Sequence, residues 1–152
     1  MFTEDTLFEM LKDWYHTDLV RAKDIYSSYD CYSSESKMFF ELKCRDTHYD
    51  QLLIEKMKYD HLIELAQSFS FEPIYVCSTP NGVWEFNINA MDMVWFEQDD
   101  LPATSQFSNR ERVTKTVGYL DIASPWCHKI YPIDFDDIDD DWDTYEADWS
   151  SL

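Results

Sequence analysis

Residues 39–60 read FFELKCRDTHYDQLLIEKMKYD and contain two different patterns in succession. Residues 37–45 alternate between two sets of side chains, which is typical of a strand with two distinct faces. Residues 49–69 contain no glycine or proline, and their apolar residues recur at helical spacing, which predicts a helix. On the strand, one face would carry Phe39, Glu41, Lys43 and Arg45, and the other Met38, Phe40, Leu42 and Cys44.

Further elements are predicted on both sides of this stretch. Thr3 is a helix N-cap followed by acids, and the helix that it starts is expected to continue to about Ala22. Residues 25–32 are expected to form a strand that pairs with residues 37–45. A second hairpin is expected from residues 73–78 and 83–88, joined by the turn Thr79-Pro80-Asn81-Gly82. Residues 91–96 are a further expected strand, and residues 101–116 are ambiguous. The order helix, hairpin, helix, hairpin predicts a mixed α/β fold, of the α+β kind, with a central mixed sheet flanked by helices.

The chain has 152 residues, which is enough for one domain of ordinary size. It carries 31 acidic and 12 basic residues, a net charge of −19, which argues against a protein that coats nucleic acid or an anionic membrane. The charge is uneven, however. Residues 37–58 have a net charge of +1, so an anionic substrate could be tolerated there.

The C-terminal end has a different composition from the rest of the chain. Residues 134–152 hold nine of the acids and none of the bases, which leaves the rest of the chain at −10. Aromatic and aliphatic residues alternate with these acids, a composition that favours docking to a partner. We therefore expect a single domain over residues 1–130 and a flexible acidic, aromatic-containing tail over residues 131–152. A disordered, solubilising end is the alternative.

Several classes of protein are excluded by features that the sequence lacks. No apolar run is long enough to span a membrane, and the acidic N-terminus has no basic signal region, so we expect a cytoplasmic protein with no membrane contact. The four cysteines form no Cys-x-x-Cys pair, so reduced thiols are expected rather than a zinc ribbon. Cys127 and His128 could hold a metal ion only if two distant ligands joined them.

Two carboxylates and a lysine are expected to meet on the first hairpin. Glu41 and Lys43 project from the same face of their strand, and Asp30 lies on the other arm of the hairpin. This set suits the hydrolysis of a phosphodiester, in which a hard divalent cation needs oxygen ligands. Asp30 and Glu41 would hold Mg²⁺ or Mn²⁺, together with the carbonyl group of Leu42. Lys43 would orient the attacking water or stabilise charge on the phosphate.

At these residues the chain resembles the PD-(D/E)XK nuclease superfamily. The resemblance covers about residues 5–88, and the run at residues 39–60 also resembles small nuclease-like proteins encoded by bacteriophages. It implies a restriction-endonuclease-like core with the order α-β-β-α-β-β, and it matches Asp30, Glu41 and Lys43 to the two acids and the lysine of the motif. Tyr29 stands where the motif has its proline, and Glu35 is an alternative for the first acid.

The resemblance also implies further site residues. Glu9 could match an additional acid that some branches of the superfamily place on the first helix, and Lys56 could match a residue of the second helix. Arg45 and Lys58 are candidate contacts to substrate phosphate.

The sequence leaves two functions open. The first is a Mg²⁺- or Mn²⁺-dependent DNA nuclease of phage origin, acting in the infected cell on DNA ends, branches or single strands rather than on long duplex. The second is an acidic interaction protein that mimics DNA, built on an inactive nuclease scaffold. In both cases the tail could recruit a basic host protein or a phage replication protein.

Overall fold

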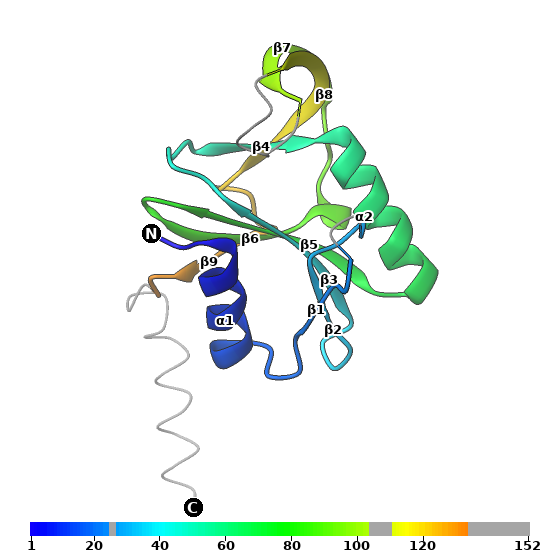
Figure 1. The fold of residues 1–152 in the computed structure, drawn as a ribbon, viewed down its shortest axis with the longest axis vertical. Helices are drawn as coiled ribbons and strands as arrows, with labels where there is room; N and C mark the ends of the chain where they lie inside the picture. Colours follow the sequence, from blue (N-terminus) through cyan, green and yellow to red (C-terminus); the bar gives the residue numbers. More distant parts are fainter. Residues whose placement is uncertain (25–26, 104–110, 134–152) are drawn as a thin grey trace, which may run out of the picture.

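A six-stranded mixed sheet forms the centre of the protein in this computed structural model, which describes residues 1–24, 27–103 and 111–133 (Figure 1). Its strands stand in the order β1-β2-β3-β5-β6-β9, and β3 and β5 are parallel while the other neighbours are antiparallel. Most of the predicted acidic tail, residues 134–152, lies outside the described residues. The strands are β1 Val20–Arg21, β2 Cys31–Ser33, β3 Met38–Cys44, β5 Glu72–Thr79, β6 Gly82–Asn87 and β9 Cys127–Tyr131.

The two helices pack on opposite faces of this sheet. Helix α1 (Glu4–Trp14) contributes to one hydrophobic cluster and α2 (Lys56–Phe69) to the other, and Figure 1 shows them on different sides of β3. The alternation predicted for β3 is confirmed, because Phe40 and Leu42 belong to the α1 cluster and Phe39 to the α2 cluster. Glu41 and Lys43 therefore project from the same face as Phe39, toward the side of α2.

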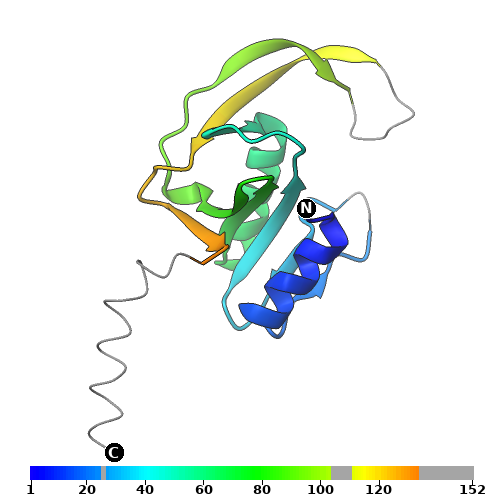
Figure 2. The same cartoon turned by 90° about the vertical axis from the view of Figure 1, so that its left-hand side faces the viewer.

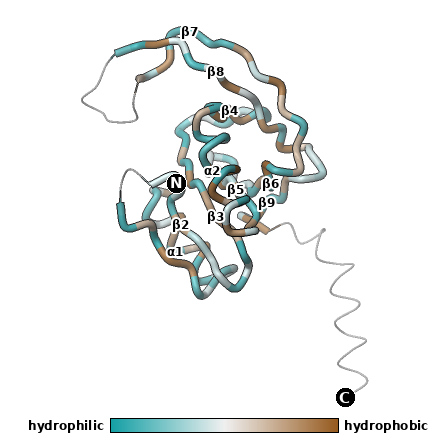
Figure 3. The backbone as a smooth tube through the Cα atoms, turned by 90° about the vertical axis from the view of Figure 1, so that its right-hand side faces the viewer, coloured by the Kyte–Doolittle hydropathy of each residue, from teal (hydrophilic) through white to brown (hydrophobic). Residues whose placement is uncertain are grey.

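A second, three-stranded sheet extends the α2 side. It has the order β4-β8-β7, formed by β4 Gln51–Glu55, β8 Arg112–Asp121 and β7 Phe96–Pro102, and the short 3₁₀ helix η1 Ile88–Ala90 precedes β7. The part of β8 that precedes Val117, residues 112–116, pairs with β7 alone. Figure 2 shows this outer part, residues 97–102 and 112–116, arching away from the body as an arm. Along the arm, hydrophilic and hydrophobic residues alternate (Figure 3).

The helix predicted at residues 49–69 is wrong in its first part. Residues 51–55 form strand β4, in which Leu52 and Ile54 are buried and the other three residues are not, and the helix starts only at Lys56. Strand β4 is stabilised by β8, which begins almost sixty residues later in the chain. Pairing with so distant a strand overrides the local helical pattern.

Three other boundaries also differ from expectation. Helix α1 ends at Trp14 and not near Ala22, because the chain turns so that Asp18 accepts hydrogen bonds from the Ser33 hydroxyl (2.7 Å) and the Glu35 amide (2.9 Å). Strand β2 has three residues rather than the eight of the expected range 25–32. The strand expected at 91–96 is instead β7, which starts at Phe96.

All four cysteines are free thiols. In the described ranges no helix has both the length and the apolar composition that crossing a membrane requires.

Replacing Gly82 with alanine should destabilise the β5–β6 hairpin. Gly82 has a φ of +149°, and a Cβ atom there would collide with the carbonyl oxygen of Tyr131 on β9. We expect a loss of about 1–3 kcal/mol in the free energy of unfolding, measured by urea denaturation. Asn81→Ala in the same turn is the matched control, because the backbone amide of Asn81, not its side chain, donates to Thr79 (3.1 Å). Equal unfolding midpoints for the two variants would contradict the expectation.

Candidate active site

Asp30 is held in place by backbone hydrogen bonds immediately before β2. Its amide donates to the carbonyl oxygen of Phe40 (2.8 Å), and its own carbonyl accepts from the amide of Ala22 (2.9 Å). Its side chain is fixed as well, because the Leu42 amide donates to Oδ2 of Asp30 (2.6 Å). Since Cys31 pairs with Phe40 in the antiparallel ladder, Asp30 lies opposite Glu41.

The carboxyl groups of Asp30 and Glu41 lie close enough to interact directly, in a largely buried setting. Burial and the charge of Asp30 together raise the pKa of Glu41 to about 8. Burial also raises the pKa of Asp30, although the hydrogen bond from Leu42 opposes this. Since its pKa is about 8, Glu41 is largely protonated at neutral pH when no cation is bound, so the two carboxyl groups together carry one proton.

Two lysines supply positive charge next to this pair. The ammonium group of Lys58, on the first turn of α2, lies 3.8 Å from Oε1 of Glu41. Lys43 lies two residues after Glu41 on the same face of β3, and its charge also lowers the pKa of Glu41. The sequence suggested Lys58 only as a phosphate contact, whereas the structure brings it to one of the carboxylates.

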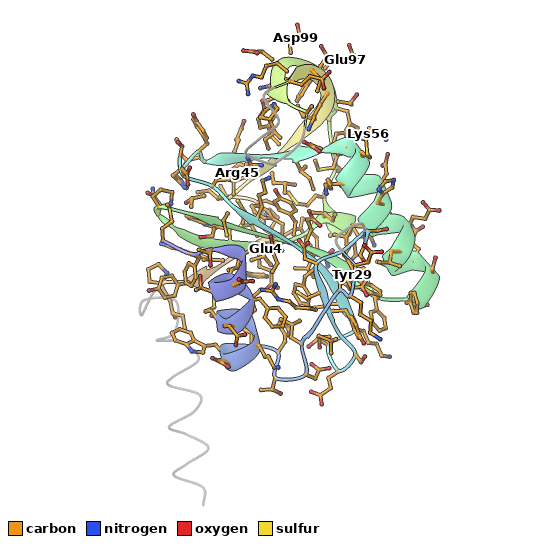
Figure 4. All side chains as sticks on the ribbon, viewed as in Figure 1. Glu4, Tyr29, Arg45, Lys56, Glu97 and Asp99 are labelled. Carbon is orange, nitrogen blue, oxygen red and sulfur yellow. The ribbon has the colours of Figure 1, made fainter. Side chains whose placement is uncertain are left out.

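Lys56, the residue expected from the second helix, points elsewhere. Its ammonium group is 2.6 Å from Oδ2 of Asp60 and 5.6 Å from the centre of the Trp95 ring. Figure 4 shows Lys56 at the start of α2, beside the base of the arm. The structure therefore does not bring Lys56 to Asp30 and Glu41.

On α1, the acid that interacts with the pair is Glu4 rather than Glu9. The pKa of Glu4 is raised, first by partial burial and then by the negative charge of Asp30. Glu4 is three and seven residues before the buried Leu7 and Leu11, so all three share one face of the helix. Glu9 is exposed, and at about 100° per residue it points roughly 140° away from Glu4. The spacing to Leu7 and Leu11 could have identified Glu4 from the sequence.

Glu35, the alternative for the first acid, lies in the turn between β2 and β3. Its amide donates to Asp18 (2.9 Å), and the turn is at the opposite end of the hairpin from Glu41. Asp30 is thus the acid that faces Glu41.

Arg45 lies at the end of β3, beneath β4 (Figure 4). Its Nη2 donates to the carbonyl oxygen of Leu53 (2.6 Å), and the hydroxyl group of Tyr75 donates to the same oxygen (3.4 Å). The guanidinium group thereby joins the ends of β3 and β4. Whether Arg45 also contacts phosphate stays a prediction.

The donors available to a cation are few. Among residues 1–24, 27–103 and 111–133 no three His, Cys, Asp or Glu side chains cluster as metal ligands, around Cys127 and His128 or elsewhere. Asp30 and Glu41 remain as a pair of carboxylates. Mg²⁺ is commonly bound by one or two carboxylates, with water and substrate phosphate completing its shell, so this pair fits such an ion.

Comparison with solved structures finds proteins of similar fold. No protein-family model and no curated protein sequence matches the chain. The Holliday junction resolvase Hjc from the archaeal hyperthermophile Archaeoglobus fulgidus is similar in structure, with a TM-score of 0.51 and 16% sequence identity, over 84% of this chain and 93% of that one. At this identity the likeness concerns the fold. The mixed α/β, restriction-endonuclease-like fold predicted from the sequence is confirmed.

Proposed function

We propose that this protein, whose fold is also that of a Holliday junction resolvase, is a Mg²⁺- or Mn²⁺-dependent nuclease that hydrolyses phosphodiester bonds in DNA. The observation that carries the proposal is the buried contact between the carboxyl groups of Asp30 and Glu41, next to Lys58. Two carboxyl groups are rarely buried together where they only stabilise a fold, because burial and mutual repulsion both oppose their ionisation.

A divalent cation would replace the proton that the two carboxyl groups share. Asp30 and Glu41 would hold the ion, and Oδ1 of Asp30 is left for it because Oδ2 accepts from Leu42. The ion would supply Lewis acidity at the phosphate and make water a better nucleophile at neutral pH. Oxygen donors favour Mg²⁺ or Mn²⁺ over softer metals.

The lysines and the backbone have separate tasks in this proposal. Lys43 orients the attacking water or donates to the phosphate oxygens on which charge develops. Lys58 offsets part of the negative charge of Glu41, to which its ammonium group is 3.8 Å distant. The Leu42 amide keeps Asp30 in one orientation, so the site is preorganised and no reordering is needed when substrate binds.

The charge distribution favours a substrate other than long duplex. Most of the net negative charge lies outside residues 37–58. On the arm, at the top of the molecule in Figure 4, the acids Glu97, Asp99 and Asp100 exceed the basic residues Arg112 and Lys115 by one charge, and Arg112 pairs with Asp100 (3.1 Å). An extended duplex would have to pass such surfaces and would be repelled, whereas a DNA end, a flap or a branch presents only a short stretch of backbone. The resemblance to phage nuclease-like proteins supports a role on viral DNA in the cytoplasm of an infected bacterial cell.

A second candidate is favoured by the net charge of −19, which is unusual for a nuclease. In that case the protein would mimic DNA and occupy the DNA-binding site of a basic protein, and it would need no cation at Asp30 and Glu41.

A cleavage assay on DNA of different forms tests the proposal. Single-stranded, flapped, four-way branched and plain duplex DNA of shared sequence would each be incubated with the protein and Mg²⁺, Mn²⁺ or EDTA. We expect cleavage of the first three, at least about tenfold slower cleavage of duplex, and none in EDTA. The absence of cleavage with either ion, together with no heat of Mg²⁺ or Mn²⁺ binding in calorimetry, would instead support the DNA mimic.

A further inference from the structure

A pocket of about 770 Å³ lies between the segment that follows β3 and the outer face of the small sheet. Its volume is in the range of roughly 300–1,000 Å³ that is typical of small-molecule sites. The face of β4 and β8 that lines it is the one turned away from α2, since Leu53 pairs with Tyr119 while Leu52 and Leu120 belong to the core. The lining residues that the argument uses are Arg45, Asp46, Tyr49, Asp50, Gln98 and Tyr119.

Aromatic rings stand at the rim of this pocket. The side chain of Tyr49 is 65% exposed and that of Tyr119 is 38% exposed, although both are large and partly apolar. Tyr119 is held by the neighbouring Phe96, whose ring centre is 5.9 Å away, and its hydroxyl group donates to Oε1 of Gln98 (2.6 Å). Two accessible rings around a hollow favour a flat ligand that can stack on them.

Polar groups within the pocket are suited to hydrogen bonding with a neutral ligand. The amide nitrogen of Gln98 has no hydrogen-bond partner among the described residues, because the side chain uses its oxygen to bind Tyr119. The Nε atom of Arg45 is buried and also lacks a partner within the described part of the chain. A ligand acceptor could pair with the amide of Gln98, which lines the pocket, whereas the buried Nε of Arg45 has no accessible surface to offer a ligand.

The charges at the pocket disfavour an anion. Among the lining residues that the structure describes, Arg45 is the one that is basic, and it already donates to Leu53, whereas Asp46 and Asp50 are exposed acids. A phosphate group would meet these acids, so the ligand that fits stacking rings and amide donors is an uncharged, planar one. A nucleobase has this chemistry.

The pocket lies next to the proposed active site along one strand. Glu41 and Lys43 lie on the same face of β3, and Arg45, in the pocket lining, follows directly after the strand. Four residues of extended chain span about 13 Å. A DNA strand with its phosphate at Asp30 and Glu41 could therefore place the base of a nearby nucleotide in the pocket.

Building on the proposed nuclease function, we propose that this pocket binds an unstacked nucleobase of the substrate strand. A base inside a duplex is stacked and paired and cannot enter without being extruded, so the pocket selects strands with at least one free base. Stacking also supplies affinity that the few basic residues of this acidic protein cannot, and it does so with little preference for sequence.

The first test uses a free nucleoside, so it does not depend on cleavage. Deoxyadenosine titrated into isotope-labelled protein should give saturable chemical-shift changes at the Gln98 side-chain amide and at Tyr49 and Tyr119. The affinity for deoxyadenosine that these changes report should fall about tenfold in Tyr49→Ala. It should be unchanged in Phe69→Ala, which alters an exposed aromatic residue outside the pocket. No response at these signals, or a response to inorganic phosphate or to a lysine-rich peptide in place of the nucleoside, would overturn the proposal.

The second test locates the base relative to the cleaved bond. A single abasic nucleotide would be moved along a single-stranded substrate and the cleavage rate measured in Mn²⁺. We expect the cleavage rate to fall about tenfold when the abasic nucleotide stands at one position near the cleaved bond. In Tyr49→Ala no position of the abasic nucleotide should have this effect. Cleavage that is equal at all abasic positions would overturn the pocket proposal and leave the nuclease function intact. No cleavage of any substrate would overturn the nuclease function, while the nucleoside titration would still decide the pocket.

Discussion

Glu41→Gln should lower the rate of DNA cleavage by roughly 10³-fold while changing DNA affinity little. Glutamine keeps the size of the side chain but removes one of the two carboxylates that would hold the cation. A catalytic metal ion contributes several kcal/mol of charge stabilisation, and each 1.4 kcal/mol or so corresponds to a factor of ten in rate. Asp30→Asn should have a similar effect. The measurement is single-turnover cleavage of labelled branched DNA, with binding followed separately by fluorescence anisotropy in Ca²⁺.

The matched controls for this experiment are Glu35, the alternative for the first acid, and Glu9, the possible additional acid. Glu35→Gln changes a residue in the β2–β3 turn, and Glu9→Gln changes an exposed residue of α1, so both should cleave at close to the wild-type rate. If Glu41→Gln retains full activity, or if Glu35→Gln loses as much activity as Glu41→Gln, the assignment of the carboxylate pair is wrong.

The first hairpin could be predicted from the sequence because its determinants are local. The alternation on residues 37–45 specifies both faces of β3, and the structure packs those faces against different helices. Asp30 and Glu41 come together through the register of a short hairpin, which sequence spacing can suggest. Glu35 had similar standing from spacing alone, and only the register distinguishes the two acids.

The second helix was predicted with the wrong start, and this error affected the site residues derived from it. Residues 51–55 have a strand pattern and a helical pattern at once, and the partner that decides between them is β8. Because the helix begins at Lys56, its first turn directs Lys58 toward Glu41, and Lys56 toward Trp95 instead. A position that depends on a distant strand cannot be obtained from a local window.

The pocket at Arg45 could not be predicted from the sequence at all. Its lining comes from residues 44–53 and from Gln98 and Tyr119, which are brought together only when β4 and β7 pair with β8. Arg45 itself was expected to face phosphate, whereas its Nη2 donates to the carbonyl oxygen of Leu53 on β4. An alternating pattern tells which face a side chain is on, but not what covers that face.

The carboxyl pair also predicts that the protein loses stability as the pH rises, and that Mg²⁺ restores it. The pKa of Glu41 is about 8 in the folded protein, because of burial and the charge of Asp30, against an ordinary value of 4.5. Between these values the folded state binds more protons than the unfolded state, so the free energy of unfolding falls with increasing pH. The change is about 1.4 kcal/mol for each unit of pKa shift, which makes the total a few kcal/mol. His16 acts in the opposite direction, because burial lowers its pKa.

Thermal unfolding in EDTA at about pH 5 and about pH 8.5, for wild type and Glu41→Gln, isolates the contribution of this one group. The wild type should lose more stability than the variant over this interval, since glutamine cannot ionise. Mg²⁺ should raise the melting temperature of the wild type more at the higher pH, because there the ion no longer competes with the shared proton. The variant should respond weakly to Mg²⁺ at both values. If both proteins lose stability in parallel, then Glu41 is ionised in the folded state throughout, and the two carboxyl groups share no proton for a cation to replace.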